Sequence, residues 1–135
     1  MLRVISFSVL IVACAAAAGC AEDAPPTTPV ETPVQVTDTF TGTMSLNGAA
    51  THLVVTTRPG QAVATLSLAP DTTAVVSFMF GTWNSQYCQV ILVKDDATTG
   101  QNLIGTASAG SFCVRVADVG RLTAPTDYQI SVTHY

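Results

Sequence analysis

Charged residues are scarce in this chain of 135 residues, which has five lysines and arginines against nine aspartates and glutamates. The formal net charge of −4 becomes −5 once Arg3 is removed with the N-terminal segment that contains it. A protein that binds nucleic acid gathers basic side chains on one face, because phosphate contacts supply much of the affinity. The shortage of lysine and arginine therefore argues against a nucleic-acid partner and against a polybasic patch for membranes.

Sequence motifs of catalysis are also missing. The chain has no H-E-x-x-H and no G-x-S-x-G pattern, and it has two histidines, His52 and His134. These two could meet across paired strands, but two imidazoles without placed carboxylates make a poor zinc site. We therefore predict no enzyme activity, no cofactor and no metal.

Calcium is the one metal that deserves separate consideration. Oxygen ligands are present at Asp95, Asp96, Asn102 and Asp118, yet the D-x-[DN]-x-[DN]-G pattern is absent. The segment from Lys94 to Gly100 is equally typical of a turn, in which Asp accepts local N–H bonds and Gly supplies a positive φ. The turn is the interpretation that we prefer.

The N-terminal segment runs from the basic Arg3 through the apolar stretch from Val4 to Ala18 into Gly19 and Cys20. This order is typical of a secretory signal. With a cysteine directly after small residues, it resembles a bacterial lipoprotein signal, which implies lipidation of Cys20 and cleavage in front of it. We therefore expect a signal peptide at 1–19 and a protein held in the bacterial envelope, at the outer membrane or cell surface, by its lipid.

Other interpretations of this segment remain open. Ile11-Val12-Ala13 precedes a second candidate, Cys14, although its apolar run would be short. Ordinary signal cleavage and a retained anchor are the remaining alternatives. A transmembrane helix needs about 20 apolar residues, and this stretch is shorter.

Prolines and threonines dominate the next segment, 20–36. Proline at this density removes backbone donors and fixes φ, so neither a helix nor a sheet can propagate. We predict a disordered linker at 20–36 and one domain at 37–135, which is the commonest domain size.

Within that domain apolar and polar residues alternate with a period of two, and turn residues separate the runs. Phe40, Gly42, Met44 and Leu46 alternate with hydroxyl residues, which predicts a half-buried strand. The eight predicted strands are 39–46, 52–58, 62–68, 74–83, 88–94, 103–107, 111–119 and 128–135. With no helical period after the signal, we predict an all-β fold, a single antiparallel β-sandwich of the jelly-roll kind.

Two cysteines, Cys88 and Cys113, lie in predicted strands of the exported domain. Export places them in an oxidising compartment, where thiols on neighbouring strands are normally joined. A redox-active pair is the alternative, but it usually has the closer C-x-x-C spacing. We predict one structural disulfide.

A family resemblance rests on the order of several short motifs. They are Phe40-Thr41-Gly42-Thr43, His52, Arg58-Pro59-Gly60, Gly81-Thr82-Trp83-Asn84 with Cys88, Phe112-Cys113-Val114-Arg115-Val116, Asp118-Val119-Gly120, and Tyr128-Gln129-Ile130-Ser131-Val132. In this order they resemble the bacterial pre-peptidase C-terminal domain. The resemblance implies a jelly-roll-like sandwich without catalytic residues, usually appended to secreted enzymes, whereas this chain carries no peptidase.

The loop from Gly81 to Cys88 concentrates residues suited to binding, namely Trp83, Asn84, Gln86 and Tyr87. Exposed aromatic rings beside amides bind glycans and peptides in many proteins. Burial of Trp83 against the disulfide is the interpretation that we favour for that residue, because the domain has few aromatic side chains for its core. We predict a non-catalytic module that binds a protein, peptide or glycan; the alternative is a structural component of the envelope without a ligand site.

Overall fold

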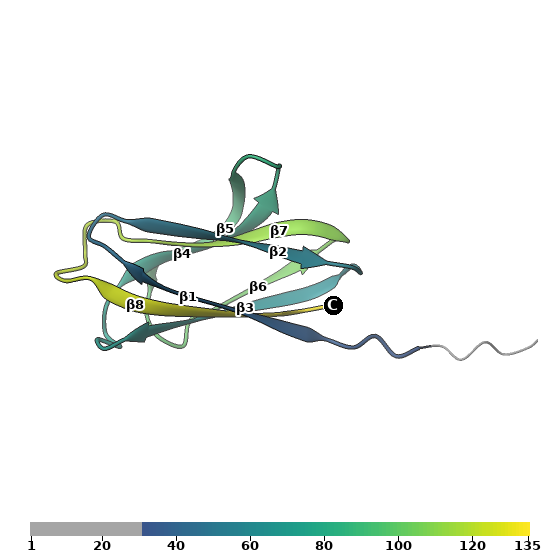
Figure 1. Ribbon diagram of the computed structural model, residues 1–135, viewed down its shortest axis with the longest axis horizontal. Coiled ribbons are helices and arrows are strands. Elements are labelled where there is room, and N and C mark those ends of the chain that lie inside the picture. The colour runs from purple at the N-terminus through teal and green to yellow at the C-terminus, as the bar shows by residue number, and fades with distance from the viewer. Residues whose placement is uncertain (1–30) are drawn as a thin grey trace, which may run out of the picture. The chain divides into compact units, whose positions relative to one another are not determined.

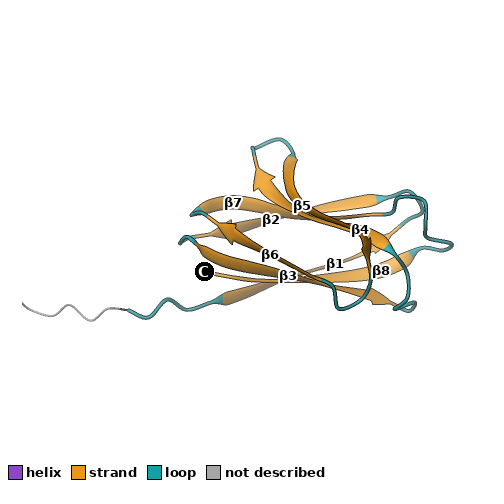
Figure 2. Ribbon diagram, turned by 180° about the vertical axis from the view of Figure 1, so that it is seen from behind, coloured by secondary structure: helices purple, strands orange, loops and turns teal. Residues whose placement is uncertain are grey.

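The computed structural model describes residues 31–135, which form eight β-strands (Figure 2). Their bounds are β1 Val36–Met44, β2 Ala49–Thr56, β3 Gly60–Ala69, β4 Val76–Trp83, β5 Cys88–Ala97, β6 Asn102–Ala107, β7 Gly110–Ala117 and β8 Thr126–His134. The first strand begins at Val36, the last residue of the predicted linker. The signal peptide at 1–19, Cys14, Cys20 and most of the linker lie outside the described residues.

The strands form two antiparallel sheets that pack face to face (Figure 1). One sheet has the order β1-β8-β3-β6 and the other the order β2-β7-β4-β5. The pairs β1–β8, β2–β7, β3–β6 and β4–β5 are nested, which is the topology of a jelly roll. The predicted all-β sandwich of eight antiparallel strands is confirmed.

Apolar side chains from both sheets fill the space between them. Phe78, Leu66 and Ile130 are among the largest side chains with almost no exposed surface. Alternation positions them, because successive residues of a strand point to opposite faces of a sheet. Leu46, predicted to continue the buried row of β1, is instead 47% exposed, since β1 ends at Met44 and Leu46 lies in the following turn.

The turn predicted at Lys94–Gly100 begins later than expected. β5 continues through Asp95 and Asp96 to Ala97, and Asp95 accepts a hydrogen bond from Ser77 Oγ on β4 at 2.7 Å. Cross-strand pairing therefore overrides the low strand propensity of two aspartates. Gly100, with φ +85°, supplies the positive φ that the sequence predicted.

The β4–β5 hairpin differs from every other connection between consecutive strands of the sandwich. Its two strands are neighbours in one sheet, whereas the other six connections cross from one sheet to the other. The β4–β5 register shifts between Phe80 and Gly81, where β5 contributes one extra residue. Such a bulge bends a strand pair, and Figure 1 shows the hairpin end rising out of the sandwich.

Across residues 31–135, no helix has the length and apolar character of a membrane span.

Candidate functional site

A disulfide holds the projecting hairpin against the sheet. Cys88 at the start of β5 bonds to Cys113 on β7, with their Cα atoms 5.7 Å apart, although β4 lies between these strands. Strands two positions apart in a flat sheet would be roughly 9.5 Å apart. The short distance means that β5 curls over β4 toward β7, and the structure forms the pair that the sequence predicted.

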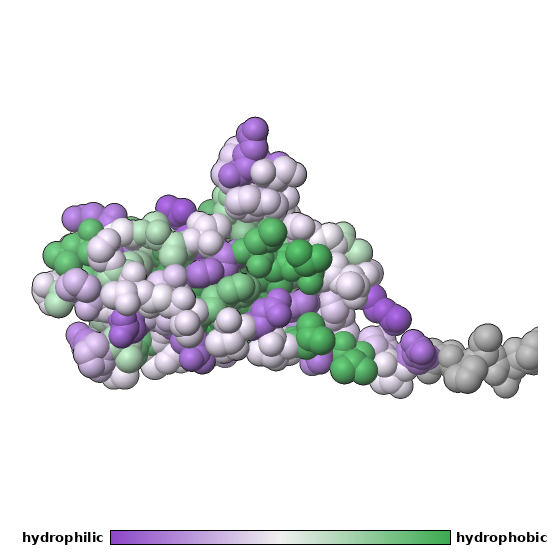
Figure 3. All heavy atoms as spheres, viewed as in Figure 1, coloured by the Kyte–Doolittle hydropathy of each residue, from purple (hydrophilic) through white to green (hydrophobic). Residues whose placement is uncertain are grey.

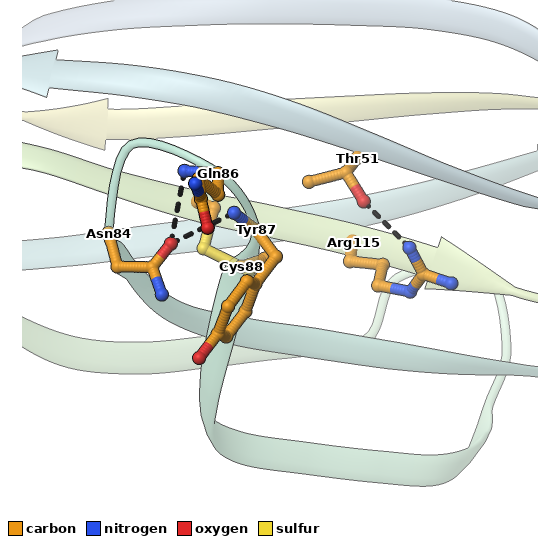
Figure 4. Close-up of a disulfide and its surroundings, with 7 residues drawn as sticks. Thr51, Asn84, Gln86, Tyr87, Cys88 and Arg115 are labelled. Atoms are coloured by element: carbon orange, nitrogen blue, oxygen red, sulfur yellow. Dashed lines mark hydrogen bonds between the residues drawn. A yellow bond between two sulfur atoms is a disulfide. The ribbon is translucent and has the colours of Figure 1, made fainter.

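The tip of the hairpin is organised by Asn84 (Figure 4). Its side-chain Oδ1 accepts hydrogen bonds from the backbone N–H groups of Gln86 at 3.1 Å and Tyr87 at 2.9 Å. The backbone N–H of Asn84 also donates to the Tyr87 carbonyl at 3.3 Å. Asn84 therefore acts as a turn former that fixes the shape of the tip.

The two aromatic side chains of the hairpin have different environments. Tyr87 is 57% exposed, as a binding residue at a loop tip should be. Trp83 is half-buried at the end of β4 and lies opposite Cys88 in the register. Trp83 thus lies beside the disulfide, as expected, but it is only half-buried and does not belong to the core, because the hairpin bends away from the sandwich before Trp83.

Apolar side chains cover the outer face of the sheet from which the hairpin rises. Leu53 and Val55 on β2 and Val93 on β5 point away from the core, and each is between 44% and 58% exposed. Val90, opposite Gly81, adds further exposed apolar area. Figure 3 shows apolar surface at the foot of the hairpin. We call these four residues together with the tip 84–87 the hairpin face.

One cation accompanies these apolar side chains. Arg115 on β7 is half-buried, and its guanidinium donates a hydrogen bond to Thr51 Oγ1 on β2 at 2.9 Å (Figure 4). Thr51 positions the guanidinium of Arg115 and uses one of its five N–H donors. The other donors of Arg115 can bind an acceptor outside the sheet.

The outer face of the other sheet has a different character. Its outward rows consist mainly of hydroxyl residues, and four threonines alternate along β1: Thr37, Thr39, Thr41 and Thr43. A polar outer face beside water is the ordinary condition of an antiparallel sheet. The contrast between the two outer faces singles out the hairpin face as unusual.

Sequence reasoning recognised the hairpin tip but missed Leu53, Val55 and Val93. The available signal was the loss of alternation in two strands, at Leu53-Val54-Val55 and from Val90 to Val93. A strand that is apolar on both faces indicates that the second face is also covered.

The two histidines lie apart and serve different contacts. His52 Nε2 is 2.9 Å from the Tyr128 hydroxyl, and its ring stacks on Phe40 with the centroids 4.7 Å apart. Burial lowers the pKa of His52 and raises the pKa of Tyr128. His134 instead pairs with Asp38 at 3.1 Å.

Two of the carboxylates considered as calcium ligands also have structural partners. The Asp118 carboxylate accepts backbone N–H bonds from Asn47, Arg121 and Leu122, which lower its pKa. Asp96 pairs with Lys94 at 2.9 Å. Over residues 31–135, no group of three or more His, Cys, Asp or Glu side chains is arranged to hold a metal.

Comparison with known proteins gives a likeness of fold. No protein-family model matches the chain, and no curated protein matches its sequence. Among solved structures, the chain is similar to the Yersinia pseudotuberculosis-derived mitogen, with a TM-score of 0.58 and 16% identity over 76% of this chain and 88% of that protein. At this identity the likeness concerns the fold alone, and it agrees with an all-β architecture.

Proposed function

We propose that this chain is a non-catalytic, lipid-anchored binding protein of the bacterial envelope, and that the hairpin face binds a protein partner. The partner would offer an apolar patch to Leu53, Val55 and Val93 and a carboxylate to Arg115. Tyr87 at the tip would contact the same partner from the side.

The observation that carries the proposal is the difference between the two outer faces of the sandwich. Exposed apolar side chains gathered on one face of a sheet favour association, because burying them removes apolar area from water at roughly 25 cal/mol per Å². Tyrosine and arginine beside such a group are the residues that most often dominate protein interfaces. The rigid hairpin reduces the entropy lost on binding, since the disulfide and Asn84 already order it.

A non-catalytic role is supported by how the polar side chains are used. His52 bonds Tyr128, His134 pairs with Asp38, and Asp118 accepts three backbone donors. These contacts serve the fold, whereas a general base needs a proton of the substrate within reach. The resemblance to pre-peptidase C-terminal domains supports the same accessory role.

Capture from the organism's envelope tests the proposal. The lipidated wild-type chain should retain a protein that is lost by Val55→Asp and by Tyr87→Ala, because the first places a charge in the apolar contact and the second removes the exposed ring. Folding of each variant is checked by its melting temperature.

Ile104→Asp is the matched control, because Ile104 lies on the outer face of the other sheet and is 56% exposed, compared with 58% for Val55. This variant should capture the partner as the wild type does. Capture that survives both hairpin-face variants, or that fails equally in the control, contradicts the proposed site and favours a structural role in the envelope.

A further inference from the structure

A groove of about 450 Å³ crosses the outer face of the other sheet, over strands β1, β8 and β3. Its volume lies within the range of pockets that hold small organic ligands. The groove lies on the opposite sheet from the hairpin face, so a ligand in the groove would bind independently of a partner on the hairpin face.

Hydrogen-bonding side chains line the groove in two rows that follow the strand register. Thr41, Gln129 and Ser67 form one row across the three strands, and Thr43, Asp127 and Ala69 form the next. The small side chain of Ala69 leaves room beside Asp127. Neighbouring members of a row are about 4.8 Å apart and the rows are nearly 7 Å apart, so the polar groups converge on one small area.

The floor of the groove is built from buried contacts. Tyr128 is 6% exposed and packs beneath Gly42, where a Cβ would lie 2.6 Å from the Tyr128 hydroxyl. His52 on the facing sheet holds that hydroxyl at 2.9 Å. These contacts fix β1 against β8 and thereby fix Thr41 and Thr43 against Asp127 and Gln129.

The chemistry of the lining selects the ligand. Hydroxyl and amide groups both donate and accept hydrogen bonds, and the Asp127 carboxylate, which already accepts from Thr43 Oγ1 at 2.5 Å, has further lone pairs for ligand hydroxyls. An anionic ligand would be repelled by Asp127, because the lining residues include no cation. An apolar ligand would leave these polar groups without partners, which is costly.

We infer that this groove binds a neutral oligosaccharide, with Asp127 and Gln129 as the principal hydrogen-bonding residues. Hydroxyl groups on a sugar ring are neutral donors and acceptors, and they match a lining of threonine, serine, amide and one carboxylate. A lysine-rich peptide is the competing ligand, since it would use the carboxylate alone.

Nuclear magnetic resonance titration tests the inference on the mature chain, residues 20–135, with Cys20→Ser to prevent lipidation. Cellohexaose, maltohexaose, xylohexaose and hexa-N-acetylchitohexaose are added separately to about 10 mM, which detects dissociation constants in the millimolar range. At least one sugar should give saturable shifts at the backbone amides of Thr41, Thr43, Asp127 and Gln129. Asp127→Ala and Gln129→Ala should each weaken binding, the former about tenfold or more.

Thr106→Ala, on β6 of the same sheet and outside the groove, is the control and should bind as the wild type does. The absence of saturable shifts with all four sugars overturns the inference. Shifts confined to the hairpin face, unchanged affinity in both groove variants, or binding of a lysine-rich peptide in place of the sugars overturn it as well.

Discussion

Gly81 on β4 lies against the backbone of Gln89 on β5 so closely that a Cβ at position 81 would overlap the Gln89 carbonyl oxygen. The register shift after Phe80 brings the two strands to this distance, and Cys113 pairs with Gly81 from the other side. The bend of the hairpin therefore depends on a residue without a side chain.

Replacing Gly81 with alanine should destabilise the domain by about 1–3 kcal/mol, because the methyl group forces backbone apart. Thermal unfolding of Gly81→Ala measures this, with Thr82→Ala, the exposed neighbouring position, as the control that should change little. Equal melting temperatures for Gly81→Ala and the wild type would show that β5 does not approach β4 in this way.

Reduction of the Cys88–Cys113 disulfide should lower the free energy of unfolding by about 3 kcal/mol, because the bond closes a loop of 25 residues in the unfolded chain. In a domain of this size that is a fall in melting temperature of roughly 10–15 °C. A Cys88→Ala/Cys113→Ala double variant should be insensitive to reductant. Two freely alkylatable thiols in the folded protein isolated from its own cells would refute the pairing.

Acidification should destabilise the sandwich in part through His52. Burial lowers its folded-state pKa below the ordinary 6.5, so the unfolded chain binds more protons as the pH falls below 6.5, and stability decreases until the folded-state pKa is passed. Melting temperatures at pH 7 and pH 5 should therefore differ less in His52→Gln than in the wild type.

All other side chains are the same in the wild type and in the His52→Gln variant, so the difference between the two proteins reports on position 52. His134→Gln is the control variant. Its melting temperature should still show the pH dependence that His52 causes. If the melting temperature changes equally between pH 7 and pH 5 in the wild type and in His52→Gln, His52 does not contribute to the pH dependence of stability.

The sequence predicted the strands well because alternation is a local property. Phe40, Gly42 and Met44 indicated one buried face without knowledge of any partner strand. Pairing is not local: β1 joins β8 from the far end of the chain, and the groove at Thr43 and Asp127 forms only when those strands meet. The aspartates at 95 and 96 suggested a turn, but both belong to β5, which pairs with β4, and Asp95 accepts a hydrogen bond from Ser77 on that strand.

The position of Trp83 illustrates the same limit. The aromatic side chain of Trp83 and the nearby Cys88 favoured burial. No feature of the local sequence indicates that β4 bends at Gly81, two residues before Trp83. The bend follows from a bulge, which depends on the register between β4 and β5.

Lipidation at Cys20 is a prediction about residues outside the described part of the chain. The protein isolated from its own bacterium should begin at Cys20, carry acyl chains and partition into detergent, and Cys20→Ser should abolish lipidation. Mass spectrometry of the N-terminal peptide measures this. A lipidated peptide that starts at Cys14, or an unmodified mature protein, would contradict the prediction.

We propose that the hairpin face, and not the opposite sheet, binds a protein. Site-specific photo-crosslinking in the living bacterium tests it most directly, with a photoreactive side chain at Val55 or at Ile104, which are similarly exposed on opposite sheets. We predict a discrete crosslinked protein from position 55 that disappears when Tyr87→Ala is added, and none from position 104. The same product from both positions, or no product from position 55, would contradict it.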